Sequence, residues 1–159
     1  MTTRRDPSAG VTLVEVLVVL VLIGVMGGAV GLAVNSTGRQ DTLLREAELL
    51  SARLHLAADD VALAGRPMAF IWGPDRYAFR MLTKGEWQLP ETGVLQRTHA
   101  LPDPLRLSEG QNRNRGQIVI SADMRPTSGE EAILRLQGDG GEVVQLAFDG
   151  ISARRVPAE

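Results

Sequence analysis

The sequence predicts an α+β protein in which the second half of a long N-terminal helix packs on an antiparallel β-sheet domain. Residues 16–34 are a run of apolar side chains and glycine without a charged or polar residue. Residues 42–65 repeat apolar side chains at helical spacing. The rest of the chain is rich in Val, Ile, Gly and Pro, a composition typical of short strands separated by turns. Helix followed by strands is the pattern of the α+β class.

The first apolar segment is long enough to span a membrane, which takes about 20 predominantly apolar residues. We therefore expect a transmembrane helix over residues 11–34. Glu15 is the anomaly in this segment, because a charge at the centre of a membrane span costs at least about 2.5–3.5 kcal/mol. Either Glu15 lies at the membrane interface and reaches water, or its carboxylate has a partner.

The second helical segment has a single apolar stripe, with residues spaced alternately by four and three. This spacing predicts an amphipathic helix that packs on a sheet of the same chain, with a coiled coil as the alternative. Gly65 and Pro67 are expected to end it. The polar segment around Gly38 is compatible with either a continuous helix or a break. The stripe consists of Leu43, Ala47, Leu50, Leu54, Ala57, Val61 and Ala64.

The remaining residues predict one antiparallel sheet of six or seven strands. Turn residues suggest hairpins at 73–76 and 138–141, the second because its Gly and Asp residues tolerate positive φ. We expect residues 89–107 to be irregular, with brief extended pieces at 94–95 and 105–107, residues 108–116 to form a polar loop and residues 123–130 a turn. The expected strands are Met68–Trp72, Tyr77–Leu82, a short one at Trp87, Ile118–Ile120, two around Leu134 and Leu146, and Ile151–Val156.

A specific motif precedes the apolar run. A polar leader of ten residues with two arginines ends in Gly10 and is followed by Val-Thr-Leu-Val-Glu, residues 11–15. This arrangement resembles the type IV prepilin signal. The resemblance implies cleavage after Gly10 by a prepilin peptidase, N-methylation of the new terminus at Val11, and pairing of Glu15 with the terminal amine of a neighbouring subunit during assembly. The sequence departs from the family in having Val at position 11, where Phe is more usual.

The order of motifs beyond the signal is similar to that of the H-type minor pseudopilins of type II secretion and related type IV pilus minor pilins. This pilin-like resemblance implies a prepilin leader at 1–10, a transmembrane helix at 11–34, a periplasmic amphipathic helix at 35–65 and a β-rich domain at 66–159. It implies a single-pass protein of a bacterial inner membrane, with a cytoplasmic N-terminus, that assembles with other pseudopilins. The segments that carry it are Ala64–Pro67, Tyr77–Phe79, Gly85–Trp87, Leu101–Pro102, Leu105–Leu107 and Asp149–Gly150.

Two other interpretations of the N-terminus stay open. A secretory signal would be cleaved near residues 31–33, where small residues are suitably placed, but its apolar region would be overlong and would contain Glu15. A plain signal anchor would have the same orientation, with Arg4 and Arg5 inside, but would have no need of the motif at 10–15.

Composition excludes several kinds of site. The chain of 159 residues has no cysteine and a net charge of −2, so disulfide and thiolate–metal frameworks are absent. His55 and His99 stand outside any metal-ligand or nucleophile pattern, and residues 138–141 lack the strand-to-helix context of a phosphate loop. We therefore predict no catalytic residue, no metal and no cofactor.

Four arginines support an alternative function. Arg113 and Arg115 in the polar loop, with Arg154 and Arg155 near the C-terminus, would contact phosphates together if the fold brought them close. A type IV pilus minor pilin that binds DNA in natural transformation is therefore the alternative. Without the leader's Arg4, Arg5 and Asp6 the chain keeps 15 basic and 18 acidic residues. This balance gives no general attraction to nucleic acid, and the favoured interpretation has no nucleic-acid partner.

Overall fold

The computed structural model describes residues 13–110, 113–122 and 131–157, with the backbone alone for residues 26–37 and 39. The chain forms two compact units, Met1–Gly38 and Arg39–Glu159. One helix, α1 (Leu13–Ala64), contributes to both. It is continuous through Gly38, so the polar segment around this residue is helical. The predicted turn at 123–130 and the leader lie outside the described residues.

In the second unit, the apolar stripe of α1 is buried as predicted. Six of its seven residues, from Leu43 to Val61, belong to the hydrophobic core, and Ala64 at the helix end is exposed. The stripe packs on the chain's own strands, which favours the sheet-packing prediction over the coiled coil. The helix ends as predicted at Gly65, which has φ +64° and whose N–H donates to Val61 O at 2.8 Å. Glycine adopts this left-handed conformation without a steric penalty.

The strands form two antiparallel sheets, whereas the sequence suggested one. The first sheet has the order β3-β2-β1-β6, and β4 also pairs with β2; the second has the order β5-β7-β8-β9. The first sheet contains β1 (Met68–Trp72), β2 (Arg76–Thr83), β3 (Glu86–Gln88), β4 (His99–Ala100) and β6 (Gly116–Ile120). The second contains β5 (Arg106–Glu109), β7 (Ala132–Gln137), β8 (Val143–Phe148) and β9 (Ala153–Val156).

The single-sheet prediction was wrong because alternating hydrophobicity identifies a strand but not its partner. β6 lies between β5 and β7 in the sequence, but β5 pairs with β7, whereas β6 pairs with β1 in the other sheet. The strands alternate between sheets at this point, so the chain order does not give the pairing order.

Two local predictions between the hairpins also need correction. Residues 94–95, expected to be extended, lie in a short helix, α2 (Gly93–Gln96), in which Leu95 is buried. A single helical turn has no periodicity for the sequence to display. The predicted loop at 108–116 is shorter than expected, because β5 continues to Glu109 and β6 begins at Gly116. By contrast, the hairpins β1–β2 and β7–β8 form as predicted.

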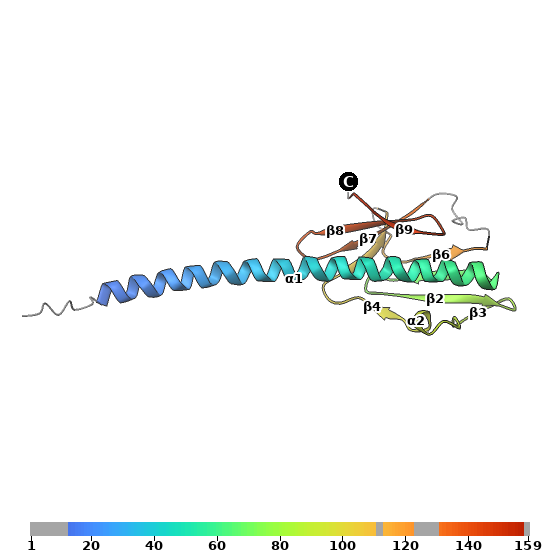
Figure 1. The fold of residues 1–159 in the computed structure, drawn as a ribbon, viewed down its shortest axis with the longest axis horizontal. Helices are drawn as coiled ribbons and strands as arrows, with labels where there is room; N and C mark the ends of the chain where they lie inside the picture. Colours follow the sequence, from blue (N-terminus) through green and yellow to red (C-terminus); the bar gives the residue numbers. More distant parts are fainter. Residues whose placement is uncertain (1–12, 111–112, 123–130, 158–159) are drawn as a thin grey trace, which may run out of the picture. The chain divides into compact units, whose positions relative to one another are not determined.

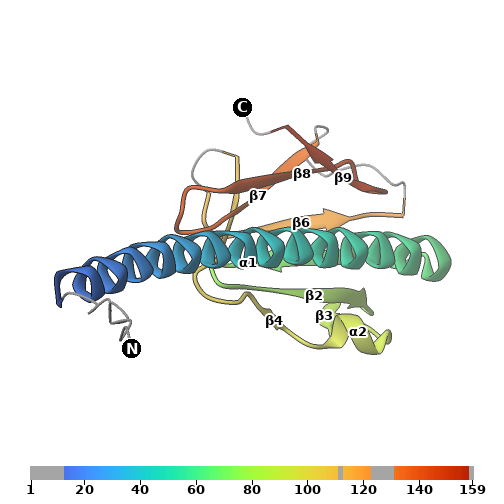
Figure 2. The same cartoon turned by 60° about the vertical axis from the view of Figure 1, so that its left-hand side comes forward.

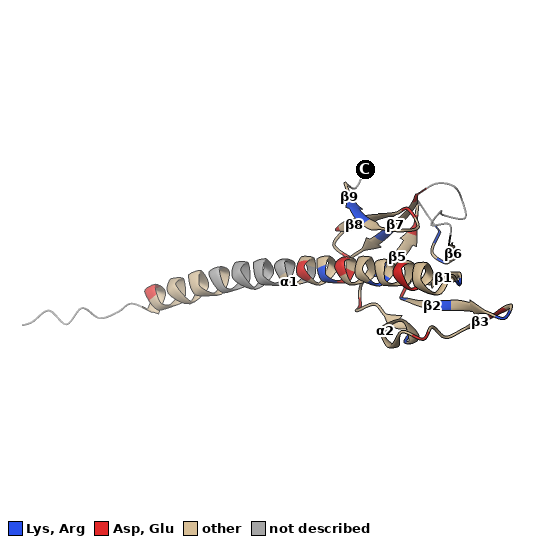
Figure 3. Ribbon diagram, turned by 45° about the vertical axis from the view of Figure 1, so that its right-hand side comes forward, with Lys and Arg blue, Asp and Glu red and all other residues tan. Residues whose placement is uncertain are grey.

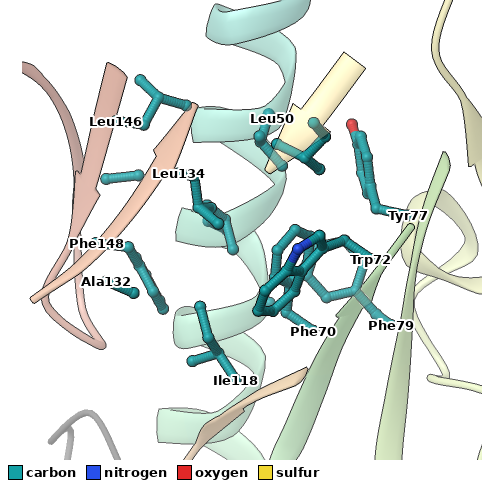
Figure 4. Packing of buried hydrophobic residues seen from close by; sticks show 14 of the residues in the cluster. Leu50, Phe70, Trp72, Tyr77, Phe79, Ile118, Ala132, Leu134, Leu146 and Phe148 are labelled. Carbon is teal, nitrogen blue, oxygen red and sulfur yellow. The ribbon is translucent and has the colours of Figure 1, made fainter. Parts of the chain in front are cut away.

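One core joins the helix to both sheets. In Figures 1 and 2, the second half of α1 runs between β7, β8 and β9 on one side and β2, β3 and β4 on the other. Figure 4 shows Leu50 of the helix between Leu134 of the second sheet and Tyr77 of the first, with Phe70 and Phe79 of the first sheet further along the same core. Phe70 stacks on Trp72 with ring centroids 5.5 Å apart. The β domain thus holds one face of α1 in its core.

Candidate assembly site

The N-terminal part of α1 has an apolar surface on every side. Its described aliphatic side chains in residues 13–25 are exposed by between 48% (Val16) and 82% (Leu13). A helix that is hydrophobic all round is normally buried, in a protein core or in a membrane. This segment therefore has a surface suited to lipid or to other apolar helices.

No helical stretch among the described side chains is both long and apolar enough to qualify as a membrane span.

Glu15 lies in the first turn of α1 and its side chain is exposed. The helix dipole stabilises a carboxylate at this end by about 0.3–1 kcal/mol. The cost of placing a charge at the centre of a membrane span is larger, at about 2.5–3.5 kcal/mol. The dipole alone would therefore not offset burial of Glu15 deep in lipid, whereas a nearby ammonium group would favour its charged form. The predicted processing residues Gly10 and Val11 lie outside the described residues.

The four candidate DNA-binding arginines are divided between the two sheets, because Arg115 directly precedes β6 of the first sheet and the other three lie at the second. Arg113 is bridged to Glu109 at one edge of the second sheet, while Arg154 and Arg155 lie on β9 at the other edge. Three strand spacings of about 4.8 Å separate the two edges, or roughly 14 Å. Figure 3 shows the basic positions of β9. These four arginines, all among the described residues, thus do not form the single basic patch that the alternative function requires.

Two of these arginines are also neutralised. Arg154 Nη2 lies 2.7 Å from Glu131 Oε1 and 2.9 Å from Oε2. Arg113 Nη1 lies 3.0 Å from Glu109 Oε2. Each carboxylate offsets the charge of its guanidinium and so weakens the attraction of that arginine for a phosphate.

Both histidines have structural contacts that the sequence did not reveal. His55 Nε2 accepts a hydrogen bond from Ala153 N–H at 3.1 Å, and Ser51 Oγ donates to Ala153 O at 2.8 Å. Ser51 and His55 are four residues apart on one face of α1 and so satisfy two backbone groups of the edge strand β9. Their spacing was the only sequence signal for this contact, and it carries no information on the partner strand.

His99 belongs to a half-buried polar cluster between β4 and α1. Its Nε2 lies 2.7 Å from Glu46 Oε2, and its ring packs on Tyr77 with centroids 4.9 Å apart. The guanidinium carbon of Arg53 lies over the Tyr77 ring, 5.6 Å from its centroid. Burial raises the pKa of the Tyr77 phenol well above its ordinary value. The cluster fixes the sheet to the helix.

Among the described residues, no group of three or more His, Asp or Glu side chains is placed to hold a metal ion.

Comparisons with known proteins match the N-terminal motif and nearly the whole chain. Residues 5–31 match the prokaryotic N-terminal methylation motif. The chain is 30% identical over 169 residues to type II secretion system protein H of Pseudomonas aeruginosa, covering 94% of this chain and 95% of that protein.

Solved structures of two proteins share the fold. The minor pseudopilin EpsH from the type II secretion system of Vibrio cholerae has a TM-score of 0.58 and 18% identity, over 75% of this chain and 96% of EpsH. The type IV minor pilin FimU of Pseudomonas aeruginosa has a TM-score of 0.56 and 15% identity, over 77% of this chain and 91% of FimU. These likenesses establish a pilin-like α+β fold with an N-terminal helix and antiparallel sheets.

The fold alone does not separate secretion from pilus proteins, since both kinds share it. The sequence relationship to secretion protein H shows the family, because it reaches 30% identity over nearly the full length of both chains. The chain belongs to the family of type II secretion system protein H, the H-type minor pseudopilins.

Proposed function

We propose that this chain is a structural subunit of a type II secretion pseudopilus and supports protein export through assembly rather than catalysis. The full-length relationship to a secretion protein H, with the motif at Gly10–Glu15, carries this proposal. A prepilin peptidase would cleave after Gly10, and Val11 would become the methylated N-terminus. Residues 11–34 would then lie in the inner membrane, with the N-terminus cytoplasmic and the β domain in the periplasm.

Glu15 has a specific role in this proposal. Cleavage creates an amine at Val11, and Glu15 of one subunit would neutralise the amine of its neighbour as the apolar helices pack. Attraction between opposite charges strengthens as water is excluded, because the effective dielectric constant falls. The pair would therefore form best in the assembled state, which makes removal of the leader the trigger for assembly.

Replacement of Glu15 tests this role. We expect Glu15→Ala and Glu15→Leu to leave membrane insertion intact but to lower the amount of chain in isolated pseudopili by about tenfold or more, as expected when about 1.4 kcal/mol or more of assembly energy is lost. The matched control is Asp41→Ala, which removes an exposed carboxylate from the same helix beyond the apolar segment. Incorporation of the Glu15 variants at the level of the control would show that the carboxylate has no part in assembly.

A further inference from the structure

The first sheet has an outer face that points away from the core. Its core-facing residues, such as Phe70 and Phe79, belong to the hydrophobic core. Successive side chains of a strand point to opposite faces, so the residues between them form the other surface. We define the outer face as Ala69, Ile71, Ala78, Arg80, Leu82, Trp87, Gln117 and Val119. Cross-strand pairs connect it: Ile71 with Ala78 and Gln117, Ala69 with Arg80 and Val119, and Leu82 with Trp87.

This outer face exposes large apolar side chains. Trp87 is 43% exposed and Ile71 is 38% exposed, while Leu89, which follows β3, is 58% exposed. The outer face of the second sheet differs: none of its large hydrophobic residues is among the exposed ones, and Ile133 and Val143 are half-buried. An exposed apolar surface with an aromatic residue is a common feature of protein interfaces.

Arg80 lies in the middle of the outer face. It stands opposite Ala69, which is fully buried, and Arg80 Nη1 donates to Phe79 O at 2.9 Å. Across the described part of the chain, no carboxylate pairs with Arg80. The guanidinium thus keeps donors for a carboxylate from outside, beside apolar surface that would exclude water.

A second cation lies at one end of the outer face. Arg115 is exposed, and within the described residues it too has no acidic partner. It lines an open hollow of about 560 Å³ together with Ile71, Ala78 and Thr98. Arg76, also at this hollow, is already paired with Asp75 at 2.8 Å. Arg80 on the outer face and Arg115 beside it are therefore two charges of the same sign that have no acidic partner in the described part of the chain.

We propose that the outer face of the first sheet docks an acidic segment of a neighbouring pseudopilin, with a carboxylate on Arg80 and apolar residues on Ile71 and Trp87. This inference rests on the proposed function, since it identifies the face through which the β domain meets its partner. Arg and Trp are the residue types that most often dominate the binding energy of an interface. A carboxylate partner matches a planar guanidinium with two parallel hydrogen bonds.

Site-specific photocrosslinking tests the docking face in the full chain, expressed with the other pseudopilins of its own secretion system. A benzophenone amino acid replaces Ile71 on the outer face or, as the matched control, Ile133 on β7 of the second sheet. We expect position 71 to crosslink to a segment of another pseudopilin that contains Asp or Glu, and position 133 to give no such product. A crosslink from position 71 only to lipid, only to a second copy of this chain, or to nothing would overturn the proposal.

Charge reversal gives the second measurement. Arg80→Glu should reduce the position-71 crosslink about tenfold or more, whereas Arg135→Glu, at a half-buried arginine of β7, should change it less than about twofold. Replacing the crosslinked acid of the partner by Arg should restore the crosslink to Arg80→Glu. Equal effects of Arg80→Glu and Arg135→Glu on the crosslink would contradict the role of Arg80. The role would also be contradicted if the Arg80→Glu chain melts like the wild type and the acid-to-Arg replacement in the partner does not restore the crosslink.

The same cells separate failure of this inference from failure of the proposed function. Normal N-terminal processing and incorporation without a crosslink from position 71 would overturn the docking face alone. Absence of the unmodified wild-type chain from isolated pseudopili would overturn the proposed function.

Discussion

Asp149 holds the turn between β8 and β9 by its side chain. Its Oδ1 accepts hydrogen bonds from the backbone N–H groups of Ile151 at 2.9 Å and Ser152 at 2.7 Å, and Gly150 takes φ +93° within the turn. These two bonds favour the charged form and lower the pKa of Asp149 from its ordinary value near 3.8. A carboxylate whose pKa is depressed by folding stabilises the fold above its unfolded pKa. That contribution is lost as the pH falls through the folded value.

Replacement of Asp149 should therefore have a pH-dependent effect on stability. At pH 7 we expect Asp149→Ala to lower the free energy of unfolding by about 1–2 kcal/mol. The difference from the wild type should shrink below pH 3.8, because the wild-type carboxyl becomes protonated there. Asp149→Asn keeps an oxygen acceptor and should lose less. Urea titrations of the three chains at pH 7 and pH 3 measure this, and equal stability of wild type and Asp149→Ala at pH 7 would contradict the account.

Gly116 is required by the indole of Trp72. The two residues are partners across β1 and β6, and a Cβ at position 116 would lie 2.3 Å from Trp72 Cζ2. Trp72 is buried and stacked on Phe70, so its ring has little room to move. We expect Gly116→Ala to cost about 1–3 kcal/mol of stability, as overpacking of a core does. Gly93→Ala, where no atom lies within 4 Å of the added carbon, is the control; an equal thermal shift in both variants would refute the steric explanation.

At the scale of elements, the Glu46–His99 pair fastens strand β4 to helix α1. The two side chains are 13% and 18% exposed, so loss of either partner leaves the other polar group half-buried. We expect His99→Ala to destabilise the protein by about 1–3 kcal/mol. The exposed pair of Arg106 with Asp103 should give less than about 1 kcal/mol in Arg106→Ala. A double-mutant cycle with Glu46→Ala measures the coupling, and a coupling energy near zero would show that the pair does not stabilise the contact.

Which elements the sequence predicts depends on how local their signals are. The hairpin β1–β2 follows from an apolar run at 68–72 and an alternating run at 77–82 on either side of a Gly-Pro turn, and β7–β8 from a Gly-rich turn, so both were predicted. The division into two sheets depends on β6 pairing with β1 across more than forty residues, and no local pattern encodes that choice. The helical turn at Val94 and Leu95 is too short to show a period.

In the candidate site, too, the sequence reveals residues with a local signal and misses contacts between residues far apart in the chain. Glu15 was recognised because it breaks an apolar run at a fixed distance from Gly10. The contact of Glu46 with His99 joins residues 53 apart in the chain and has no sequence signature. Likewise, the sequence did not place Arg113 and Arg154 at opposite edges of a sheet, because it did not give the strand order.

At the scale of the whole molecule, the chain combines two surfaces for which we propose different partners. The N-terminal part of α1 is apolar all round, with one carboxylate in its first turn, whereas the β domain has a core of its own and an exposed apolar face around Arg80. Helices of this kind associate through packing and through satisfied polar groups. The proposed assembly therefore depends first on a free amine at Val11, which only cleavage of the leader creates.

The N-terminus of the intact protein, measured by mass spectrometry after coexpression with a prepilin peptidase, tests this claim most directly. The account predicts a chain that begins at N-methylated Val11, and an uncleaved chain for Gly10→Ala. A wild-type chain that begins near Val34, or that remains uncut at Met1 or Thr2 in the presence of active peptidase, would contradict it.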